Sequence, residues 1–379
     1  MPTGRPCCQP VCDYMEIGIV GLPKSGKTTI FNALTHGRAQ VSAHAASAGA
    51  NIGIAKVPDE RLPSLARMFQ PQKVVPAEIK YVDVAAAPKG FGKGEGISGA
   101  FLNQLSRADA LVQVIRAFPD DNVPHIENSI DPKRDITILG LELAFSDLAI
   151  IERRLQKVES SLKAAKGSER DPYLREQALL SRIKSGLESE VPVYRQSLNS
   201  EEIKAISVYQ FLTAKPTLVV LNIGESQLEQ AAALESEIRA LYPYPQFVIV
   251  ALCGKLEMEL SEMSDEDAGV FRKDMKLGEP ALARMVKLSY DLLGLISFLT
   301  VGADEVRAWS ITRGTTAVKA AGKIHSDLER GFIRAEVIPF PQLIECGSMA
   351  EAKRRGLLRL EGKNYVVQDG DVVTVLFNV

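Results

Sequence analysis

The sequence predicts an α/β protein whose main part is a doubly wound, mostly parallel sheet. Three observations lead to this prediction. An apolar, β-branched run at residues 16–20 is followed by a glycine-rich loop and then by a helical pattern. Further short apolar runs alternate with helical patterns, as is typical of parallel strands joined by helices. The spacing of apolar residues changes near residues 136 and 294, which predicts an inserted helical part and a C-terminal α+β part.

The bulk composition narrows the class of protein. A chain of 379 residues is too long for one ordinary core, so two or three domains are expected. The net charge of −2 gives no overall attraction to nucleic acid or anionic lipid, and no DNA or membrane partner is predicted. No apolar run reaches the roughly 18 residues of a membrane span. Residues 1–14 lack the apolar centre of a secretory signal and are expected to be a disordered tail, so the prediction is a cytoplasmic protein.

The cysteines indicate neither a disulfide framework nor a zinc site. Of the five, Cys7, Cys8 and Cys12 lie in the tail, whereas Cys253 and Cys346 lie in regions that are expected to fold. An odd, scattered count argues against disulfides. No His or Cys pair at ligand spacing completes a metal site with the tail cysteines.

A phosphate-binding loop lies close to the start of the chain. Residues 21–28 read GLPKSGKT, which is the pattern G-x-x-x-x-G-K-[ST]. Backbone N–H groups of such a loop, and of the helix that follows it, attract phosphate oxygens. We expect Lys27 to contact the β- and γ-phosphates of a nucleotide and Thr28 to bind Mg²⁺. The residues predicted to bind nucleotide here are Leu22, Pro23, Lys24, Ser25, Gly26, Lys27, Thr28 and Thr29.

The other apolar runs complete the predicted sheet. The run at 78–88 predicts a buried strand that brings Asp83 to its carboxyl end. In a sheet parallel to the first strand, a carboxylate at that position is a second candidate ligand of Mg²⁺. The remaining predicted strands lie at residues 51–57, 108–118, 215–225 and 247–254.

Two further parts interrupt and follow this pattern. Apolar residues recur at helical spacing over residues 136–202, with a break at KGSERDP, which predicts an antiparallel helical hairpin. Because buried strands resume afterwards, the hairpin is an insertion into a P-loop domain of residues 15–135 and 203–293. Residues 294–379 carry β-rich pieces, one helix at 316–331 and the hairpin signal QDGD, which predicts a compact α+β module.

Several motifs together resemble one known family. The segments are GIVGLPKSGKTTIFNAL, PQKVVPAEIKYVDVA, KGFGKGEG, DDNVPHIE and AAGKIHSDLERGFIRAEVI. From Met15 onward the chain resembles the YchF, or Obg-like ATPase, family of P-loop proteins. The resemblance implies a G domain, an inserted hairpin and a C-terminal ubiquitin-like TGS domain. It also implies a cytoplasmic nucleotide switch that associates with ribosomes and prefers ATP to GTP.

The base preference is expected to depend on residues 222–225. A guanine-specific G domain uses N-K-x-D, whose Asp accepts hydrogen bonds that adenine does not offer. Here the stretch reads NIGE, so Asn222 and Glu225 match the family's N-x-x-E variant, with Ile223 between them. The resemblance also implies that Cys253 and Gly254 lie in the loop that contacts the nucleotide base. ATP is therefore favoured and GTP stays an alternative, as does a simple helix-capping role for Glu225.

The segment expected to sense the γ-phosphate departs from the usual pattern of G domains. Where D-x-x-G has its glycine, the chain has Ala86, and Ala87 follows it in place of a water-orienting residue. The resemblance implies that His125 acts in hydrolysis, which suits a side chain that titrates near neutrality. It also aligns Ser47 with a switch threonine that binds Mg²⁺, and it makes KGFGKGEG a second switch.

Two functions remain open from the sequence. The first is a slow ATPase switch that docks on the ribosome, with Lys27 and His125 as catalytic residues and Thr28, Ser47 and Asp83 around Mg²⁺. The second is a hydrolysis-impaired module that binds nucleotide and RNA or protein, and Ala86 favours it. A small-molecule kinase is more distant, because no cluster of arginines for a substrate phosphate appears. In the C-terminal module, Lys353, Arg354, Arg355 and Arg359 are candidate phosphate contacts.

Overall fold

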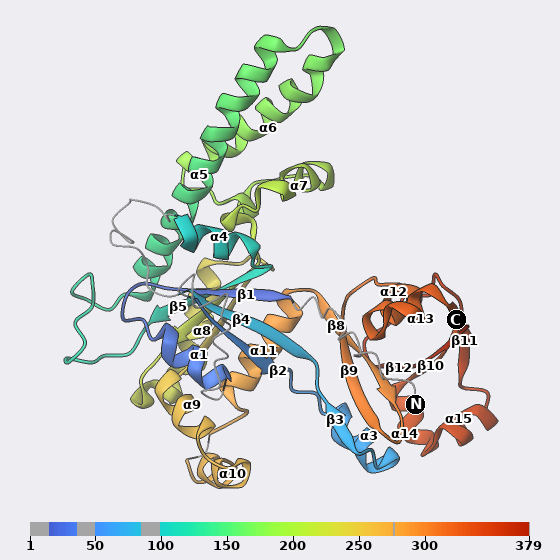
Figure 1. The fold of residues 1–379 in the computed structure, drawn as a ribbon. Helices are drawn as coiled ribbons and strands as arrows, with labels where there is room; N and C mark the ends of the chain where they lie inside the picture. Colours follow the sequence, from blue (N-terminus) through green and yellow to red (C-terminus); the bar gives the residue numbers. More distant parts are fainter. Residues whose placement is uncertain (1–14, 36–49, 85–98, 276, 379) are drawn as a thin grey trace, which may run out of the picture. The chain divides into compact units, whose positions relative to one another are not determined.

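The computed structural model describes residues 15–35, 50–84, 99–275 and 277–378, and its chain divides into two compact units. The P-loop unit consists of the described residues of Glu16–Ile54 and Lys80–Leu282. The C-terminal unit consists of residues 55–79 and 283–378. Figure 1 shows the ribbon of both units, coloured along the sequence.

The P-loop unit is built on a six-stranded sheet with the order β2-β4-β1-β5-β6-β7. Every pairing from β4 to β7 is parallel, which confirms the predicted fold class. All residues of β5 and β6 are buried, which explains why they read as continuous apolar runs. The strands are β1 (Glu16–Val20), β2 (Ala50–Lys56), β4 (Glu78–Val84), β5 (Ala110–Arg116), β6 (Thr217–Asn222) and β7 (Phe247–Leu252).

Helices connect these strands and enclose a core around the sheet. The core includes Leu105, Leu139, Val219 and Ile249, each of which is fully buried. The helices are α1 (Lys27–Thr35), α4 (Gly99–Arg107), α5 (Pro132–Ala164), α6 (Arg170–Glu188), α7 (Ser200–Ile206), α8 (Ala231–Leu241), α9 (Gly254–Ser261) and α10 (Asp265–Asp274). Short 3₁₀ turns lie at Gly167–Glu169, Val193–Arg195, Ser207–Tyr209, Leu212–Ala214 and Glu225–Gln230.

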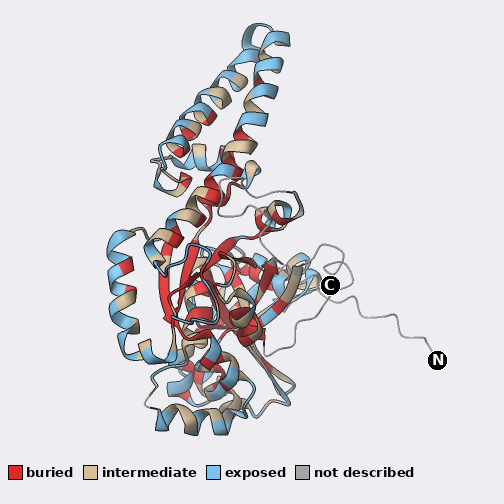
Figure 2. Cartoon of the chain, turned by 90° about the vertical axis from the view of Figure 1, so that its left-hand side faces the viewer, coloured by how far each residue is buried: buried red, intermediate tan, exposed pale blue. Residues whose placement is uncertain are grey.

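The hairpin predicted between residues 136 and 202 is present as α5 and α6. Helix α5 begins at Pro132 because the Asp131 carboxylate accepts hydrogen bonds from the backbone N–H groups of Lys133 and Arg134. The two helices run side by side away from the sheet (Figures 1 and 2), and their outer ends are mostly exposed. A small core that contains Ile151 and Ile183 holds them together.

The C-terminal unit has a second six-stranded sheet, with the order β11-β10-β12-β8-β9-β3. Strand β10 is antiparallel to β11 and β12, β8 is antiparallel to β9, and the β12–β8 and β9–β3 pairings are parallel. Its strands are β3 (Lys73–Val75), β8 (Leu295–Val301), β9 (Glu305–Thr312), β10 (Phe332–Pro339), β11 (Arg359–Glu361) and β12 (Asp371–Phe377). Its helices are α3 (Arg61–Phe69), α11 (Ala281–Leu292, which begins in the P-loop unit), α12 (Ala317–Ile324), α13 (Ser326–Arg330), α14 (Phe340–Cys346) and α15 (Met349–Arg354).

Two segments lie in a different unit from the one expected. The sequence pattern assigned residues 55–79 and 283–293 to the P-loop domain, but both cluster with the C-terminal unit. For residues 55–79 the reason is that β3 extends the second sheet, with Lys73 opposite Glu305 in register. In addition, the Arg61 guanidinium forms an ion pair with Asp369 at 2.9 Å. The C-terminal unit is thus assembled from two separate stretches of chain.

Two local predictions in the C-terminal unit were wrong. The QDGD turn forms, since the Asp371 N–H donates to the Gln368 carbonyl at 3.2 Å, but it does not join two strands of a hairpin. Strand β12 pairs with β10 and β8 instead. The helix expected at 316–331 is divided at His325, whose extended backbone ends α12. The His325 side chain then accepts the Asp327 N–H at the start of α13.

None of the helices in the described part of the chain is both long enough and apolar enough to cross a membrane.

Candidate nucleotide-binding site

The loop between β1 and α1 has the backbone conformation of an anion cradle. Lys24 and Gly26 both have positive φ, 64° and 91°. Helix α1 begins at Lys27, so its unpaired N–H groups face back toward the loop. Glycine is required at position 21 as well, because a Cβ there would lie 2.5 Å from the Val114 carbonyl oxygen. The loop is therefore shaped by close packing against β5.

Lys27 is held close to this loop by the loop's own carbonyl groups. Its Nζ donates to the carbonyl oxygens of Gly21 at 2.8 Å and Leu22 at 3.3 Å. Burial lowers the pKa of the Lys27 ammonium group, and the nearby Asp83 carboxylate opposes that shift. Two of the three ammonium protons are engaged, which leaves one donor for a phosphate oxygen.

Two of the three residues expected around Mg²⁺, Thr28 and Asp83, meet beside this lysine. The Thr28 hydroxyl donates to Asp83 Oδ2 at 3.4 Å. Burial raises the pKa of Asp83, while the Lys27 charge and hydrogen bonds from Asn51 and Thr28 lower it. A hydroxyl and a carboxylate are hard oxygen ligands, and they fit an ion that also takes phosphate and water oxygens. The described residues contain no cluster of three or more His, Cys, Asp or Glu side chains that would hold a metal unaided.

Asn222, at the end of β6, ties the phosphate loop to α9. Its Nδ2 donates to the Ser25 carbonyl at 2.9 Å, and its Oδ1 accepts the Gly254 N–H at 3.0 Å. A Cβ on Gly26 would lie 2.2 Å from that Nδ2 atom. The Asn222 side-chain amide is therefore a brace within the protein, because its hydrogen bonds fix the phosphate loop relative to α9. The Ser25 hydroxyl is buried and makes no hydrogen bond within the described structure.

A cavity of about 370 Å³ opens next to the brace. Its volume falls in the range of small-ligand sites. It begins at Gly26 and Thr29 of the phosphate loop and continues between the loops that follow β5, β6 and β7. The lining residues are Gly26, Thr29, Phe118, Pro119, Asp120, Asn222, Ile223, Gly224, Glu225, Ser226, Cys253 and Lys255. This is the carboxyl edge of a parallel sheet, where α/β proteins bind their ligands.

Comparisons with known proteins agree with this geometry. A family model described as "50S ribosome-binding GTPase" matches residues 16–142. A second model, described as "YchF-GTPase_C", a protein of unknown function, matches residues 295–378. Among curated relatives, the "Ribosome-binding ATPase YchF" of Bacillus subtilis (strain 168) is 40% identical over 368 residues, which is 96% of this chain and 100% of that protein. The protein of the same name from Escherichia coli O157:H7 is 39% identical over 365 residues, 96% of this chain and 99% of that protein. The chain belongs to the YchF family.

The solved structure of the Schizosaccharomyces pombe YchF GTPase supports the same assignment. It matches with a TM-score of 0.83 and 29% identity, and the match covers 96% of this chain and 97% of that one. The two units and the inserted hairpin therefore belong to one architecture that is shared along the whole length.

The remaining predicted nucleotide-binding residues lie in or next to this cavity. Ile223, Glu225 and Cys253 all line the cavity. The Glu225 carboxylate accepts a hydrogen bond from Lys255 Nζ at 3.2 Å, and both side chains are more than half exposed. Gly254 contributes its N–H to Asn222 and is not among the lining residues. Burial raises the pKa of the Cys253 thiol, so this group is a neutral, apolar part of the wall.

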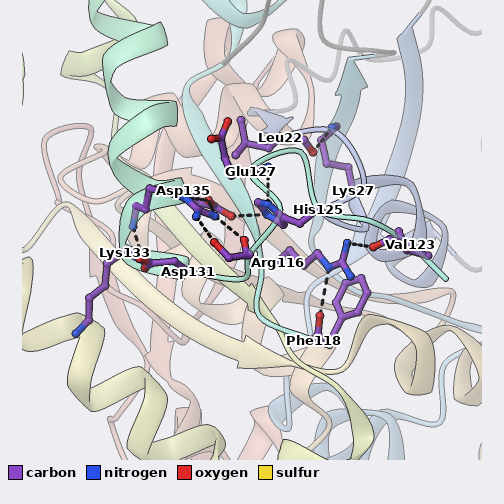
Figure 3. Close-up of polar contacts among 12 residues, drawn as sticks. Leu22, Lys27, Arg116, Phe118, Val123, His125, Glu127, Asp131, Lys133 and Asp135 are labelled. Carbon is purple, nitrogen blue, oxygen red and sulfur yellow. Dashed lines mark hydrogen bonds and ion pairs between the residues drawn. The ribbon is translucent and has the colours of Figure 1, made fainter. Parts of the chain in front are cut away.

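His125 lies in the loop after β5, and both of its ring nitrogens are engaged (Figure 3). Nδ1 accepts the Glu127 N–H at 3.1 Å, so the ring proton is on Nε2, which donates to Asp135 Oδ2 at 2.8 Å. The other oxygen of Asp135 pairs with the Arg134 guanidinium at 2.9 Å. In this arrangement the imidazole has no free nitrogen to act on a water molecule.

Several predicted site residues lie outside the described residues. These are Ser47, Ala86 and Ala87, together with the KGFGKGEG segment and the tail cysteines Cys7, Cys8 and Cys12. Their predicted roles stay predictions.

Of the four candidate phosphate contacts in the C-terminal unit, Arg354, Arg355 and Arg359 form ion pairs with acidic side chains. Glu351 binds both Arg354 at 2.7 Å and Arg355 at 2.5 Å. Arg359 Nη1 lies 3.4 Å from Glu361. A phosphate contact at these arginines would have to compete with carboxylates that are already in place.

Sequence reasoning missed the wall formed by Phe118, Pro119 and Asp120. These residues follow β5 directly, and the carboxyl ends of parallel strands share one edge of a sheet. That rule would have found them, since β5 lies beside β6 and thus beside Asn222.

Proposed function

We propose that this chain is a slow, ATP-preferring and Mg²⁺-dependent nucleotide hydrolase that works as a cytoplasmic switch on the ribosome. One observation carries the proposal. The phosphate loop, with Lys27 at its centre, is braced by Asn222 directly beside a cavity of about 370 Å³. A triphosphate on the loop places its base in that cavity. The printed names of the relatives, "Ribosome-binding ATPase YchF", support the activity and the partner.

The residues around the cavity favour adenine over guanine. A guanine site needs a buried carboxylate for the base N1–H and 2-amino groups, and Glu225 instead is half-exposed and paired with Lys255. Guanine bound here would leave its N1–H and 2-amino donors without a buried acceptor, which costs about 1–3 kcal/mol, roughly a tenfold to hundredfold change in affinity. Competition of unlabelled ATP and GTP against a fluorescent ATP analogue tests the assignment. We expect ATP to compete at least tenfold better, and the reverse order would overturn the adenine assignment.

We propose roles for four residues on the phosphate side of the site. Lys27 neutralises charge on the β- and γ-phosphates, and Thr28 and Asp83 would hold Mg²⁺, which supplies further charge neutralisation when bound. His125 orients the attacking water once it releases the Glu127 N–H from Nδ1. Asp135 then keeps the proton on Nε2 and leaves the Nδ1 lone pair free. We expect His125→Ala to lower phosphate release at least tenfold while ATP affinity stays within about threefold.

Ribosome dependence is tested by phosphate release with and without purified ribosomes. The switch predicts that ribosomes stimulate release by the wild-type protein and that Lys27→Ala abolishes the response. Absence of stimulation, with normal ATP binding, would remove the ribosome from the proposal.

A second candidate function is a nucleotide-binding module that hardly hydrolyses. The observation that favours it is the double engagement of His125, which leaves no ring nitrogen for water. Single-turnover phosphate release distinguishes the two functions. A rate equal to that of His125→Ala, with intact ATP binding, supports the second candidate and excludes the first.

A further inference from the structure

Arg116 is a buried cation for which the proposed mechanism has no use. It is the last residue of β5, and only 2% of it is exposed. Its guanidinium forms no ion pair with any acidic side chain of the described residues. Burial of an unpaired charge is expensive, so a residue of this kind is expected to have a specific task.

The Arg116 guanidinium organises the loop that follows it. Its Nε donates to the Phe118 carbonyl at 3.2 Å, Nη1 to the Val123 carbonyl at 2.6 Å and Nη2 to the Asp120 carbonyl at 3.2 Å. It also lies over the Phe118 ring, 4.5 Å from the centroid (Figure 3). One planar fork thus satisfies three carbonyl groups, a geometry that lysine cannot reproduce.

The loop that Arg116 holds is one wall of the cavity. Phe118, Pro119 and Asp120 all line it. Arg116 also stands in register with Asn222 on β6, and the Ala117 N–H donates to the Asn222 carbonyl at 2.8 Å. The wall is therefore anchored to the same strand end that braces the phosphate loop.

We propose that Arg116 is a positioning residue for recognition of the nucleotide base. Arg116 fixes residues 118–123 so that the wall formed by Phe118, Pro119 and Asp120 closes the cavity in which the base binds. Arg116 does not itself touch the ligand. This inference rests on the proposed nucleotide-binding function. It implies that loss of the fork weakens binding of the base and leaves binding of the phosphates unchanged.

The test compares two ligands and three variants. ATP carries a base, whereas inorganic tripolyphosphate carries only the phosphates, and both are titrated with Mg²⁺ present. For Arg116→Gln and Arg116→Lys we expect ATP to bind at least tenfold more weakly and tripolyphosphate to change less than twofold. The matched control is Arg272→Gln. It removes a mostly buried arginine of the same unit whose partner is Glu257, and ATP affinity should stay within twofold.

The outcomes separate this inference from the function on which it rests. A wild-type protein that binds neither ligand would contradict the proposed function. A wild-type protein that binds ATP, with Arg116→Gln equal to it, would overturn only the positioning role. Full affinity in Arg116→Lys with loss in Arg116→Gln would show that the charge matters and the fork does not, which also overturns it. Equal loss of both ligands would do the same.

Hydrogen exchange gives a second readout if Arg116→Gln folds poorly. In Arg116→Lys the amides of residues 118–123 should exchange faster, while those of β5 and β6 keep the wild-type rate. Unchanged exchange in the loop would contradict the proposal, because the loop would then be held by other contacts.

Discussion

The proposed nucleotide site has two halves that are built in different ways: a phosphate half, which is the loop of residues 21–28, and a base half, which is the cavity beside that loop. The phosphate half comes from one continuous stretch, residues 21–28, whose shape depends on glycines and on the loop's own carbonyl groups. The base half collects single residues from the ends of β5, β6 and β7, and it is held by side chains such as Asn222 and Arg116. One continuous segment therefore supplies the first half, although β5 and Asn222 support it, whereas only tertiary structure assembles the second half.

This difference determines how mutations should act on each half. In the phosphate half the interactions are charged and close to the ligand, so single changes should abolish binding. In the base half several partial contacts share the work, so single changes should weaken binding by smaller factors. Four predictions test this contrast.

The largest effect is expected for Lys27→Ala. The variant loses the ammonium group that the carbonyl groups of Gly21 and Leu22 hold beside the phosphate loop. Because charged hydrogen bonds to phosphate are strong, we expect ATP affinity to fall at least 100-fold, or about 2.7 kcal/mol. Isothermal titration measures this, with the exposed Lys157→Ala in the hairpin as the control for loss of a lysine. An ATP affinity within tenfold of wild type would contradict the expectation that single changes in the phosphate half abolish binding.

A smaller but still large effect is expected for Gly26→Ala. The substitution adds a Cβ that would lie 2.2 Å from Asn222 Nδ2, at a φ of 91° that disfavours any side chain. ATP should bind about 30-fold more weakly, and the melting temperature should fall. The matched control is Gly140→Ala in α5, where a Cβ meets open space. That variant should gain about 0.5–1 kcal/mol of stability. Wild-type binding in Gly26→Ala would show that the loop tolerates the displacement of Asn222.

Asn222→Ala is expected to act on both halves at once. It removes the hydrogen bonds to Ser25 and Gly254, each of which contributes about 1 kcal/mol. We expect ATP and inorganic tripolyphosphate both to bind about tenfold more weakly. Asn222→Asp keeps the acceptor for Gly254 and loses the donor to Ser25, so it separates the two contacts. If Asn222→Ala bound ATP more weakly and tripolyphosphate as well as the wild type does, Asn222 would act on the base half only.

The smallest effect is expected for Lys255→Ala at the rim of the base half. Its pair with Glu225 is exposed on both sides, and such pairs contribute about 0–1 kcal/mol. ATP affinity should change less than threefold, and the change should shrink as the salt concentration rises. A tenfold change that resists salt would mean that Lys255 contacts the nucleotide directly.

The same contrast explains what the sequence could predict. The phosphate loop, its strand and its helix lie next to one another along the chain, so the motif identified them completely. The family assignment and the mostly parallel sheet were also predicted. The family resemblance singled out His125, but its hydrogen bonds to Glu127 and Asp135 were not predicted, because they depend on how the loop folds back onto α5.

The missed features share a physical cause. Phe118 and Arg116 carry no motif, and their importance comes from the lateral order of the strands, which spacing alone does not determine. The transfer of residues 55–79 to the C-terminal unit is of the same kind. Strand β3 is short and mostly exposed, so its apolar pattern is weak, and only its pairing with β9 shows where it belongs.

That pairing has a consequence for the synthesis of the protein. Strand β3 and helix α3 leave the ribosome early, whereas β9, the strand that β3 pairs with, is made only after the whole P-loop unit. Since domains form as their chain emerges, the P-loop unit must fold while this early segment still waits for its partners. The C-terminal unit therefore cannot be transferred to another protein by a gene fusion at residue 294, because α3 and β3 would be missing from it.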